Sequence, residues 1–134
     1  MDQGFITREQ ADAADVDGIL AFFLSDIGNL AMKSNDVYRE FKFSVLSDAG
    51  AYYSGADGEQ VLLQGVIDLA IVQDDGIYLV DFKTDKVTED TLSQVVNGYL
   101  GQVLAYKNAL EKIFSKPVKD AKLYFFRLKQ FADV

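Results

Sequence analysis

The sequence predicts a mixed α/β fold, in which helices flank a central mixed sheet. Two neighbouring apolar runs, residues 61–72 and 77–83, are rich in β-branched and aromatic side chains, as strands are. Residues 91–114 repeat apolar side chains at helical spacing, and a further apolar run follows at residues 121–128. A strand, a helix and a strand in this order predict a right-handed crossover, which makes the last strand parallel to its neighbour.

Residues 1–36 are predicted to form a helical scaffold. Thr7 and Gln10 are spaced as a capping box for a short helix. A second helix is expected to end near Leu24, and residues 25–34 add one or two further helical turns. Four apolar residues of the second helix are expected to pack inward: Ile19, Leu20, Phe22 and Phe23.

Residues 37–134 are predicted to hold the sheet and the long helix, within a single domain over residues 1–134. Residues 37–46 alternate apolar and polar side chains, which indicates a half-buried strand. The Gly and Asp content of residues 48–59 predicts a loop, and Pro117 ends the long helix. The first three strands therefore form an antiparallel meander.

Charged residues interrupt the two apolar runs at Asp68, Asp81 and Lys83. A buried carboxylate is costly unless it is paired or binds a metal. Residues 73–76 have the composition of a hairpin turn. If Gln73 pairs with Gly76, Asp68 lies opposite Asp81. If Asp75 and Gly76 form the loop instead, Asp68 faces Lys83.

Either register predicts one polar and one apolar face of the hairpin. The polar face gathers Gln64, Asp68, Asp81 and Lys83. The apolar face is expected to contain Ile67, Leu69, Ile71, Tyr78, Val80 and Phe82. Directly opposed residues have Cβ atoms roughly 4.5–5.5 Å apart, so two carboxylates could share Mg²⁺, which prefers oxygen ligands. A partly solvated charge cluster at a sheet edge is the alternative.

These residues resemble the PD-(D/E)XK nuclease superfamily. The segments GVID at residues 65–68, DFKTD at residues 81–85 and Y-x-x-Q-x-x-x-Y at residues 99–106 resemble its RecB-type branch. Three further segments resemble the C-terminal nuclease domain that belongs to the A subunits of the bacterial ATP-dependent helicase-nucleases (AddA or RexA): residues 4–12, 22–28 and 39–44. The resemblance covers essentially the whole chain.

The resemblance implies a restriction-endonuclease-like core and Mg²⁺-dependent hydrolysis of DNA, with Mn²⁺ as a substitute metal. It implies that Asp68, Asp81 and the backbone carbonyl of Phe82 bind the metal, and that Lys83 positions the attacking water. Cleavage would proceed in one step, without a covalent enzyme intermediate. The implied role is exonuclease action on DNA ends during double-strand-break repair and recombination.

Further residues are candidates for support of the site or contact with DNA. Gln102 and Tyr106 share one face of the long helix, where they either reach the site or pack the helix on the sheet. Glu40 is either an additional acidic ligand or a solvated strand residue, and Thr84 and Lys86 are candidates for phosphate contact. Small residues are expected to allow close backbone approach at Gly98, Gly101 and Ala105.

Composition limits the partners that the chain is expected to have. The net charge of −8 argues against a free-standing nucleic-acid binder, because basic residues supply most non-specific affinity for phosphates. We therefore expect DNA to be delivered by the helicase portion of the same full-length chain. The chain has no Cys, which excludes an iron–sulfur cluster and, by the resemblance, favours the A-type subunit over its partner, the B-type subunit. No apolar stretch is long enough to span a membrane, and we expect a cytoplasmic protein.

The chain also has no His, whereas the resemblance implies a metal-binding His on a helix before the GFIT segment. We therefore expect a fragment that lacks its first helix and is weakly active or inactive alone. Two alternatives to this nuclease assignment exist. One is a non-catalytic docking or regulatory module of the same fold, and the other is a different RecB-type nuclease of phage or CRISPR-associated origin.

Overall fold

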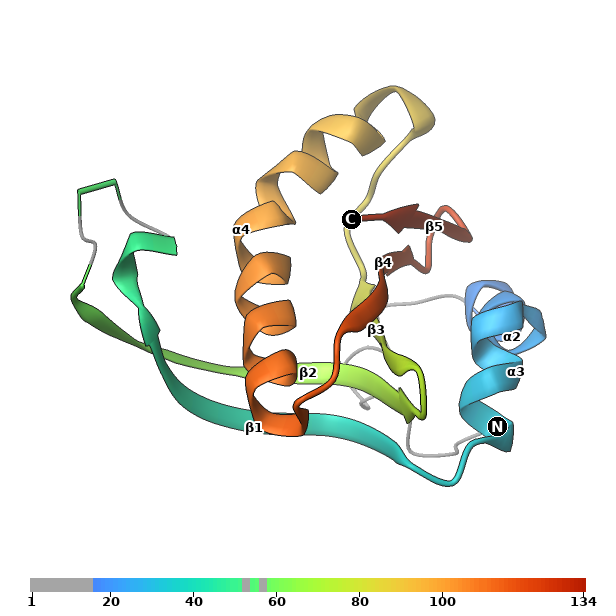
Figure 1. Ribbon diagram of the computed structural model, residues 1–134. Coiled ribbons are helices and arrows are strands. Elements are labelled where there is room, and N and C mark those ends of the chain that lie inside the picture. The colour runs from blue at the N-terminus through green and yellow to red at the C-terminus, as the bar shows by residue number, and fades with distance from the viewer. Residues whose placement is uncertain (1–15, 52–53, 56–57) are drawn as a thin grey trace.

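The computed structural model describes residues 16–51, 54–55 and 58–134, and the capping box expected at Thr7 and Gln10 lies outside these residues (Figure 1). Nine elements follow one another along the described chain: α2 (Val16–Leu24), α3 (Asp26–Lys33), β1 (Val37–Asp48), η1 (Ala49–Ala51), β2 (Gln60–Gln73), β3 (Gly76–Lys83), α4 (Glu89–Phe114), β4 (Val118–Phe125) and β5 (Gln130–Asp133).

The strands form one mixed sheet in the order β1-β2-β3-β4-β5. The pairs β1–β2 and β2–β3 are antiparallel, and β4 lies parallel to β3 after the long helix α4. This arrangement confirms the predicted fold class of a three-stranded meander, a helix and a parallel fourth strand. The short strand β5, which the sequence did not predict, pairs antiparallel with β4 at the sheet edge.

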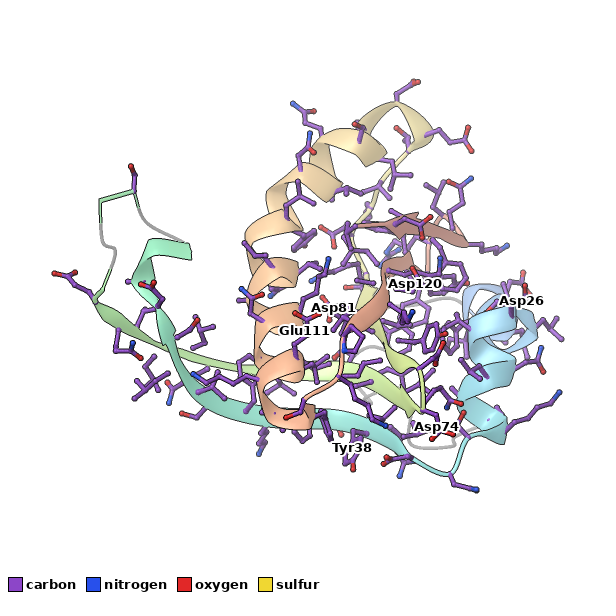
Figure 2. All side chains as sticks on the ribbon, viewed as in Figure 1. Asp26, Tyr38, Asp74, Asp81, Glu111 and Asp120 are labelled. Atoms are coloured by element: carbon purple, nitrogen blue, oxygen red, sulfur yellow. The ribbon has the colours of Figure 1, made fainter. Side chains whose placement is uncertain are left out.

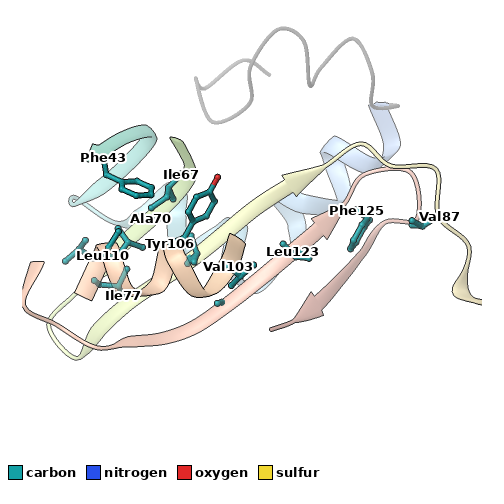
Figure 3. Close-up of a cluster of buried hydrophobic side chains, with 14 residues drawn as sticks. Phe43, Ile67, Ala70, Ile77, Val87, Val103, Tyr106, Leu110, Leu123 and Phe125 are labelled. Carbon is teal, nitrogen blue, oxygen red and sulfur yellow. The ribbon is translucent and has the colours of Figure 1, made fainter. Parts of the chain in front are cut away.

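Helices cover both faces of the sheet (Figure 1). On one face α4 packs through Val103, Tyr106 and Leu110 onto side chains of β1 to β4 (Figure 3). On the other face α2 and α3 contribute a second apolar cluster: Ile19, Phe22, Ile27 and Ala31 against Leu69, Ile71, Val80, Phe82 and Tyr124. The burial of both faces explains why β3 and the end of β2 are almost continuously apolar.

The two N-terminal helices form where the sequence predicted them. Ser25 caps α3, since its hydroxyl accepts the N–H of Gly28 at 3.1 Å. The hydroxyl of Tyr124 donates to the carbonyl of Gly18 at 2.6 Å and thereby ties α2 to β4. The prediction that Leu20 packs inward was wrong, because this side chain is 47% exposed.

Strands β2 and β3 separate at the charged residues. β2 pairs with β1 from Gln60 to Ile71, but it pairs with β3 only from Leu69 to Gln73. The pairing of Gln73 with Gly76 selects the first of the two predicted registers. In this register Asp68 comes opposite Asp81 one step beyond the last pair, so both carboxylates lie at the point where the two strands diverge. We call this point the β2–β3 fork.

Both β1 and β2 change faces at the fork. Glu40 adopts a left-handed backbone with φ of 49°, and it is skipped in the pairing between Arg39 and Phe41. As a result Ile67 packs in the cluster beneath α4, whereas Leu69 packs in the cluster beneath α2 and α3. The prediction that Ile67 shares the face of Leu69 was therefore wrong.

The same change of face moves Gln64 away from the fork. Its side chain is exposed and donates to the Ser44 hydroxyl of β1 at 3.4 Å. The expected gathering of Gln64 with the three charged residues was therefore wrong. The apolar face is otherwise as predicted, with Leu69, Ile71, Tyr78, Val80 and Phe82 in or against one cluster.

Candidate active site

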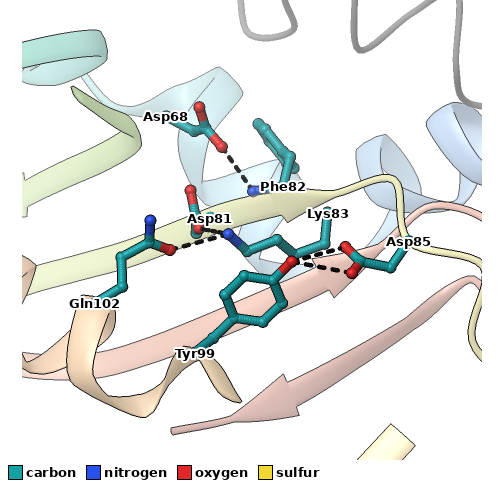
Figure 4. A network of polar contacts seen from close by, with 7 residues as sticks. All are labelled: Asp68, Asp81, Phe82, Lys83, Asp85, Tyr99 and Gln102. Atoms are coloured by element: carbon teal, nitrogen blue, oxygen red, sulfur yellow. Dashed lines mark hydrogen bonds and ion pairs between the residues drawn. The ribbon is translucent and has the colours of Figure 1, made fainter. Parts of the chain in front are cut away.

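The carboxylates at the fork lie in different surroundings. Asp81 is 5% exposed and is the buried charged residue of the described chain. Asp68 is half-buried, and its Oδ2 accepts the backbone N–H of Phe82 at 2.8 Å (Figure 4). Figure 2 shows Asp81 between α4 and the sheet, while Asp26 and Asp74 lie at the periphery. A carboxylate in the interior requires a compensating charge.

The backbone of Phe82 also faces the fork. In the β2–β3 hairpin the residues that exchange hydrogen bonds alternate, and Tyr78 and Val80 bond toward β2. Phe82 is the next residue in this series, so its N–H and its carbonyl oxygen both point toward β2. Asp68 receives the N–H where the strand ladder has ended. The side chain thus replaces a ladder bond and fixes the relative position of Asp68 and β3.

Lys83 supplies the compensating charge. Its Nζ lies 2.6 Å from Asp81 Oδ2 and donates to Gln102 Oε1 at 3.0 Å. The ammonium also lies 3.8 Å from the ring centroid of Tyr99, a cation–π contact. The short approach to Asp81 is an ion pair without the alignment of a hydrogen bond, so Oδ2 is buried with no hydrogen bond from any described residue.

Helix α4 places two polar side chains at the fork and a third beside it, over the adjoining part of β2. The helix starts after Thr88, whose backbone N–H donates to the Thr91 hydroxyl at 3.0 Å. Tyr99, Gln102 and Tyr106 follow at helical spacing and share the face that meets the sheet. Gln102 and Tyr99 both contact Lys83 of β3, and the role of Gln102 at the site stays a prediction.

Tyr106 packs on the part of β2 beyond the fork. Its ring meets Phe43 edge to face with centroids 5.7 Å apart, and it lies over Gly65, where an added Cβ would come within 3.1 Å of the ring. Burial, then the charges of Asp81 and Asp68, raise the pKa of the Tyr106 hydroxyl to about 12. The hydroxyl therefore stays protonated beside the two carboxylates. Within the described chain no hydrogen bond joins Tyr106 to Gln102.

Among the described residues, the remaining candidates make no hydrogen bond or ion pair to Asp81 or Lys83. Glu40 is exposed, opposite Asp68 on the neighbouring strand. Thr84 is half-buried, and its carbonyl accepts Nε of Arg127 at 2.9 Å, while Lys86 is exposed.

Gly98 and Gly101 of α4 do not bring the helix onto the sheet. An added Cβ at Gly98 or Gly101 would meet no atom within 4 Å, and both residues are exposed. The prediction that they allow close backbone approach was therefore wrong. Gly65 of β2 fills that role instead.

Sequence reasoning missed the contact between Tyr99 and Asp85. The Tyr99 hydroxyl donates to both carboxylate oxygens of Asp85, at 3.1 and 2.9 Å. Burial, then this hydrogen bond, raises the pKa of Tyr99. Tyr99 and Asp85 belong to two of the segments that resemble RecB-type nucleases, residues 99–106 and 81–85. Only the way α4 packs against the loop after β3 brings the two side chains together.

The oxygen donors at the fork fit a hard divalent cation. Among the described residues there is no group of three His, Cys, Asp or Glu side chains that could hold a metal. Two carboxylates lie at the fork, one of them with a buried oxygen that has an ion pair but no hydrogen bond. By the alternation along a strand, the Phe82 carbonyl lies on the same side of β3 as the N–H that reaches Asp68. Carboxylate and carbonyl oxygens are the donors that Mg²⁺ accepts, usually with several waters.

The chain belongs to the PD-(D/E)XK nuclease superfamily, whose family model matches residues 9–133. The mixed sheet with its parallel fourth strand is consistent with the restriction-endonuclease-like core expected for this superfamily. In the described part of the chain, no helix is long and apolar enough to cross a membrane.

The chain is also similar to the A subunits of ATP-dependent helicase/nucleases. It is 36% identical over 130 residues to the protein of Carboxydothermus hydrogenoformans, 35% over 125 residues to that of Clostridium acetobutylicum and 38% over 131 residues to that of Bacillus cereus. These alignments cover 96%, 90% and 90% of this chain but only 11%, 10% and 11% of the relatives. The chain thus spans about a tenth of the length of the curated relatives it matches.

Proposed function

We propose that the β2–β3 fork is the active site of a metal-dependent nuclease that hydrolyses DNA phosphodiesters. One observation carries the proposal: Asp81 is buried with an ion pair to Lys83, and Asp68 lies in the same fork. Two carboxylates and a lysine held together inside a sheet are costly unless they bind a cation and a phosphate. Membership of the PD-(D/E)XK superfamily supports the same chemistry.

Asp68, Asp81 and the Phe82 carbonyl would hold Mg²⁺, with Mn²⁺ as a substitute. When bound, the ion supplies Lewis-acid stabilisation of the phosphate and lowers the pKa of a bound water. Two features of the chain prepare the site for it. The Phe82 N–H fixes one oxygen of Asp68, and burial keeps competing water from Asp81.

Lys83 positions the attacking water and offsets the negative charge that develops on the phosphate oxygens. Gln102 holds the ammonium by accepting one of its N–H groups. The water oxygen forms a bond to phosphorus while the bond from phosphorus to the leaving oxygen breaks. Solvent takes the proton that the attacking water loses and supplies the proton that the leaving oxygen gains. No Ser, Cys or His lies among the described contacts of the fork, so hydrolysis proceeds in one step, without a covalent enzyme intermediate.

The relatives' names extend the proposal to the full-length protein. We propose that this domain works with a helicase portion of the same longer chain and with a B-type partner, acts as an exonuclease and trims DNA ends in double-strand-break repair in the cytoplasm. Co-purification of the full-length protein with this partner tests the assembly. ATP-dependent shortening of linear DNA by that complex, and not by the complex with Asp81→Asn, tests the role.

Metal binding by this chain tests the site. We expect calorimetry to detect Mn²⁺ binding and a metal-dependent rise in the melting temperature, both lost in Asp81→Asn. Asp74→Asn is the matched control, since Asp74 is an exposed residue at the β2–β3 turn. In the full-length protein, Asp81→Asn should abolish Mn²⁺-dependent cleavage of DNA and Asp74→Asn should preserve it. Equal Mn²⁺ binding by Asp81→Asn and parent would refute the metal site and favour a non-catalytic docking module.

A further inference from the structure

Lys83 is restrained more tightly than an ion pair requires. A lysine side chain has a flexible four-carbon stem and loses rotamer entropy when it is fixed. Here the ammonium meets a carboxylate, an amide oxygen and an aromatic ring, from Asp81, Gln102 and Tyr99. Figure 4 shows the tyrosine ring beside the end of the lysine side chain.

The ring contact differs chemically from the other two. Attraction between an ammonium and the face of a ring is electrostatic, so the ring needs no oxygen acceptor to restrain the charge. Asp81 and Gln102 account for two directions of approach. The ring therefore adds a third restraint on the position of the ammonium, from a direction different in kind from the two oxygen contacts.

Tyr99 is in turn held by Asp85. Its hydroxyl lies 3.1 and 2.9 Å from the two carboxylate oxygens, which is a charge-assisted contact. Asp85 follows Lys83 by two residues, in the loop between β3 and α4. The hydrogen bond from Tyr99 to Asp85 joins the β3–α4 loop to α4. It therefore fixes the Tyr99 ring, which lies against Lys83, relative to that loop.

We propose that Asp85 and Tyr99 are positioning residues that fix the ammonium of Lys83 at the fork. This inference rests on the proposed function for its catalytic meaning, but the contact itself is testable without activity. Tyr99 contacts the ammonium and Asp85 contacts Tyr99, so the two residues act on the site through Lys83. Loss of the ring should displace the ammonium, and loss of Asp85 should loosen the ring.

The first test measures the position of Lys83 by NMR on the whole chain. A ring face at this distance should shift the ε-methylene protons of Lys83 upfield. We expect the shift to vanish in Tyr99→Leu, to persist in Tyr99→Phe and to shrink in Asp85→Ala. Tyr78→Phe is the matched control, because Tyr78 makes a similar hydrogen bond to Asp75 at 3.0 Å in the hairpin. An unchanged Lys83 signal in Tyr99→Leu overturns the proposal.

The second test measures turnover and Mn²⁺ affinity in the form that cleaves DNA. Misplacement of the ammonium should lower kcat of Tyr99→Leu roughly ten- to a hundredfold, with KM and Mn²⁺ affinity unchanged. The double variant Asp85→Ala/Tyr99→Phe should lower kcat no more than the more damaging of the two single variants. Both substitutions remove the same contact, the hydrogen bond between Tyr99 and Asp85. A purely structural role would instead lower kcat and Mn²⁺ affinity together and overturn the proposal. If the parent cleaves nothing, the proposed function fails while the NMR result still decides the position of Lys83.

Discussion

At the scale of single residues, Asp81 and Lys83 offset each other's charge within the fork. Asp81 and Lys83 are both largely buried, with side chains 8% and 12% exposed, and they lie 2.6 Å apart. A pair of this kind gains little net stability, because desolvation offsets the Coulomb attraction. We therefore attribute the Asp81–Lys83 pair to function and not to stability: Asp81 would bind the cation and Lys83 would contact the phosphate.

Replacement of Lys83 separates metal binding from catalysis. Lys83→Met leaves Asp81 without its ion pair, so we expect the metal-free protein to lose up to about 3 kcal/mol of stability. The ammonium no longer competes for Asp81 Oδ2, and Mn²⁺ affinity by calorimetry should be unchanged or higher. Turnover should fall far more, because the lysine acts on charge that develops in the transition state. Normal turnover in Lys83→Met would rule out a catalytic lysine.

The Tyr106 hydroxyl predicts a specific sensitivity to alkali. Its pKa is raised from 10.0 to about 12 in the folded chain. Between these values the unfolded chain releases the proton and the folded chain keeps it, so this group lowers stability as pH rises. We expect the difference in unfolding free energy between parent and Tyr106→Phe to shift in favour of the variant from about pH 9 to about pH 11. Urea unfolding at both pH values measures it, and a constant difference would show that the hydroxyl is not perturbed.

At the scale of elements, α4 joins the two arms of the fork. It contacts β3 through Gln102 and Tyr99, and it contacts β2 beyond the fork through Tyr106 over Gly65. The relative position of the arms therefore depends on how closely the helix approaches the glycine.

Two glycines on facing elements should respond in opposite ways. Gly65→Ala places a Cβ 3.1–3.2 Å from the rings of Tyr106 and Phe43, so we expect a loss of about 1–3 kcal/mol from overpacking. Gly98→Ala adds a Cβ in open space on a helix, so we expect a gain of about 1 kcal/mol. Denaturant unfolding measures both. A destabilised Gly98→Ala would mean that this face of α4 is covered.

The elements themselves were largely predictable, and the exceptions have local causes. Turn composition left two hairpin registers open, and the pairing of Gln73 with Gly76 in the structure selects the first and fixes every later pair. The change of face could not be predicted, since it depends on a left-handed backbone at Glu40, where no glycine marks it. Strand β4 runs from Val118 to Phe125, earlier than the predicted residues 121–128, because Lys119 and Asp120 interrupt its apolar pattern.

The clustering of charged residues at the candidate site was predictable where charge interrupts an apolar pattern, and tertiary contacts around it were not predictable. Asp68, Asp81 and Lys83 were found in this way, and the structure brings them to one fork. The pairing of Tyr99 with Asp85 depends on the angle between a loop and a helix, which no sequence spacing fixes.

At the scale of the whole molecule, the net charge of −8 predicts weak affinity for DNA. Few phosphates can be neutralised, so we expect the slope of log K against log salt for single-stranded DNA to be shallower than about −1.4, the value for two phosphate contacts. Mn²⁺ should strengthen binding, and Asp81→Asn should remove this effect. Fluorescence anisotropy across a salt series measures both. A steep slope without metal would reveal a basic surface that the composition does not predict.

The polar residues of the fork all come from one continuous stretch of chain, from Asp68 on β2 to Tyr106 on α4. The elements before and after it contribute apolar cover: α2 and α3 beneath one face, and β1 and β4 beside the strands. The polar side chains and the apolar packing elements thus belong to separate segments of the chain. A protein engineer could therefore replace the apolar packing elements and transfer the candidate site as a single hairpin and helix. The same modularity would let new domains be added around this stretch in nature while its own sequence stays intact.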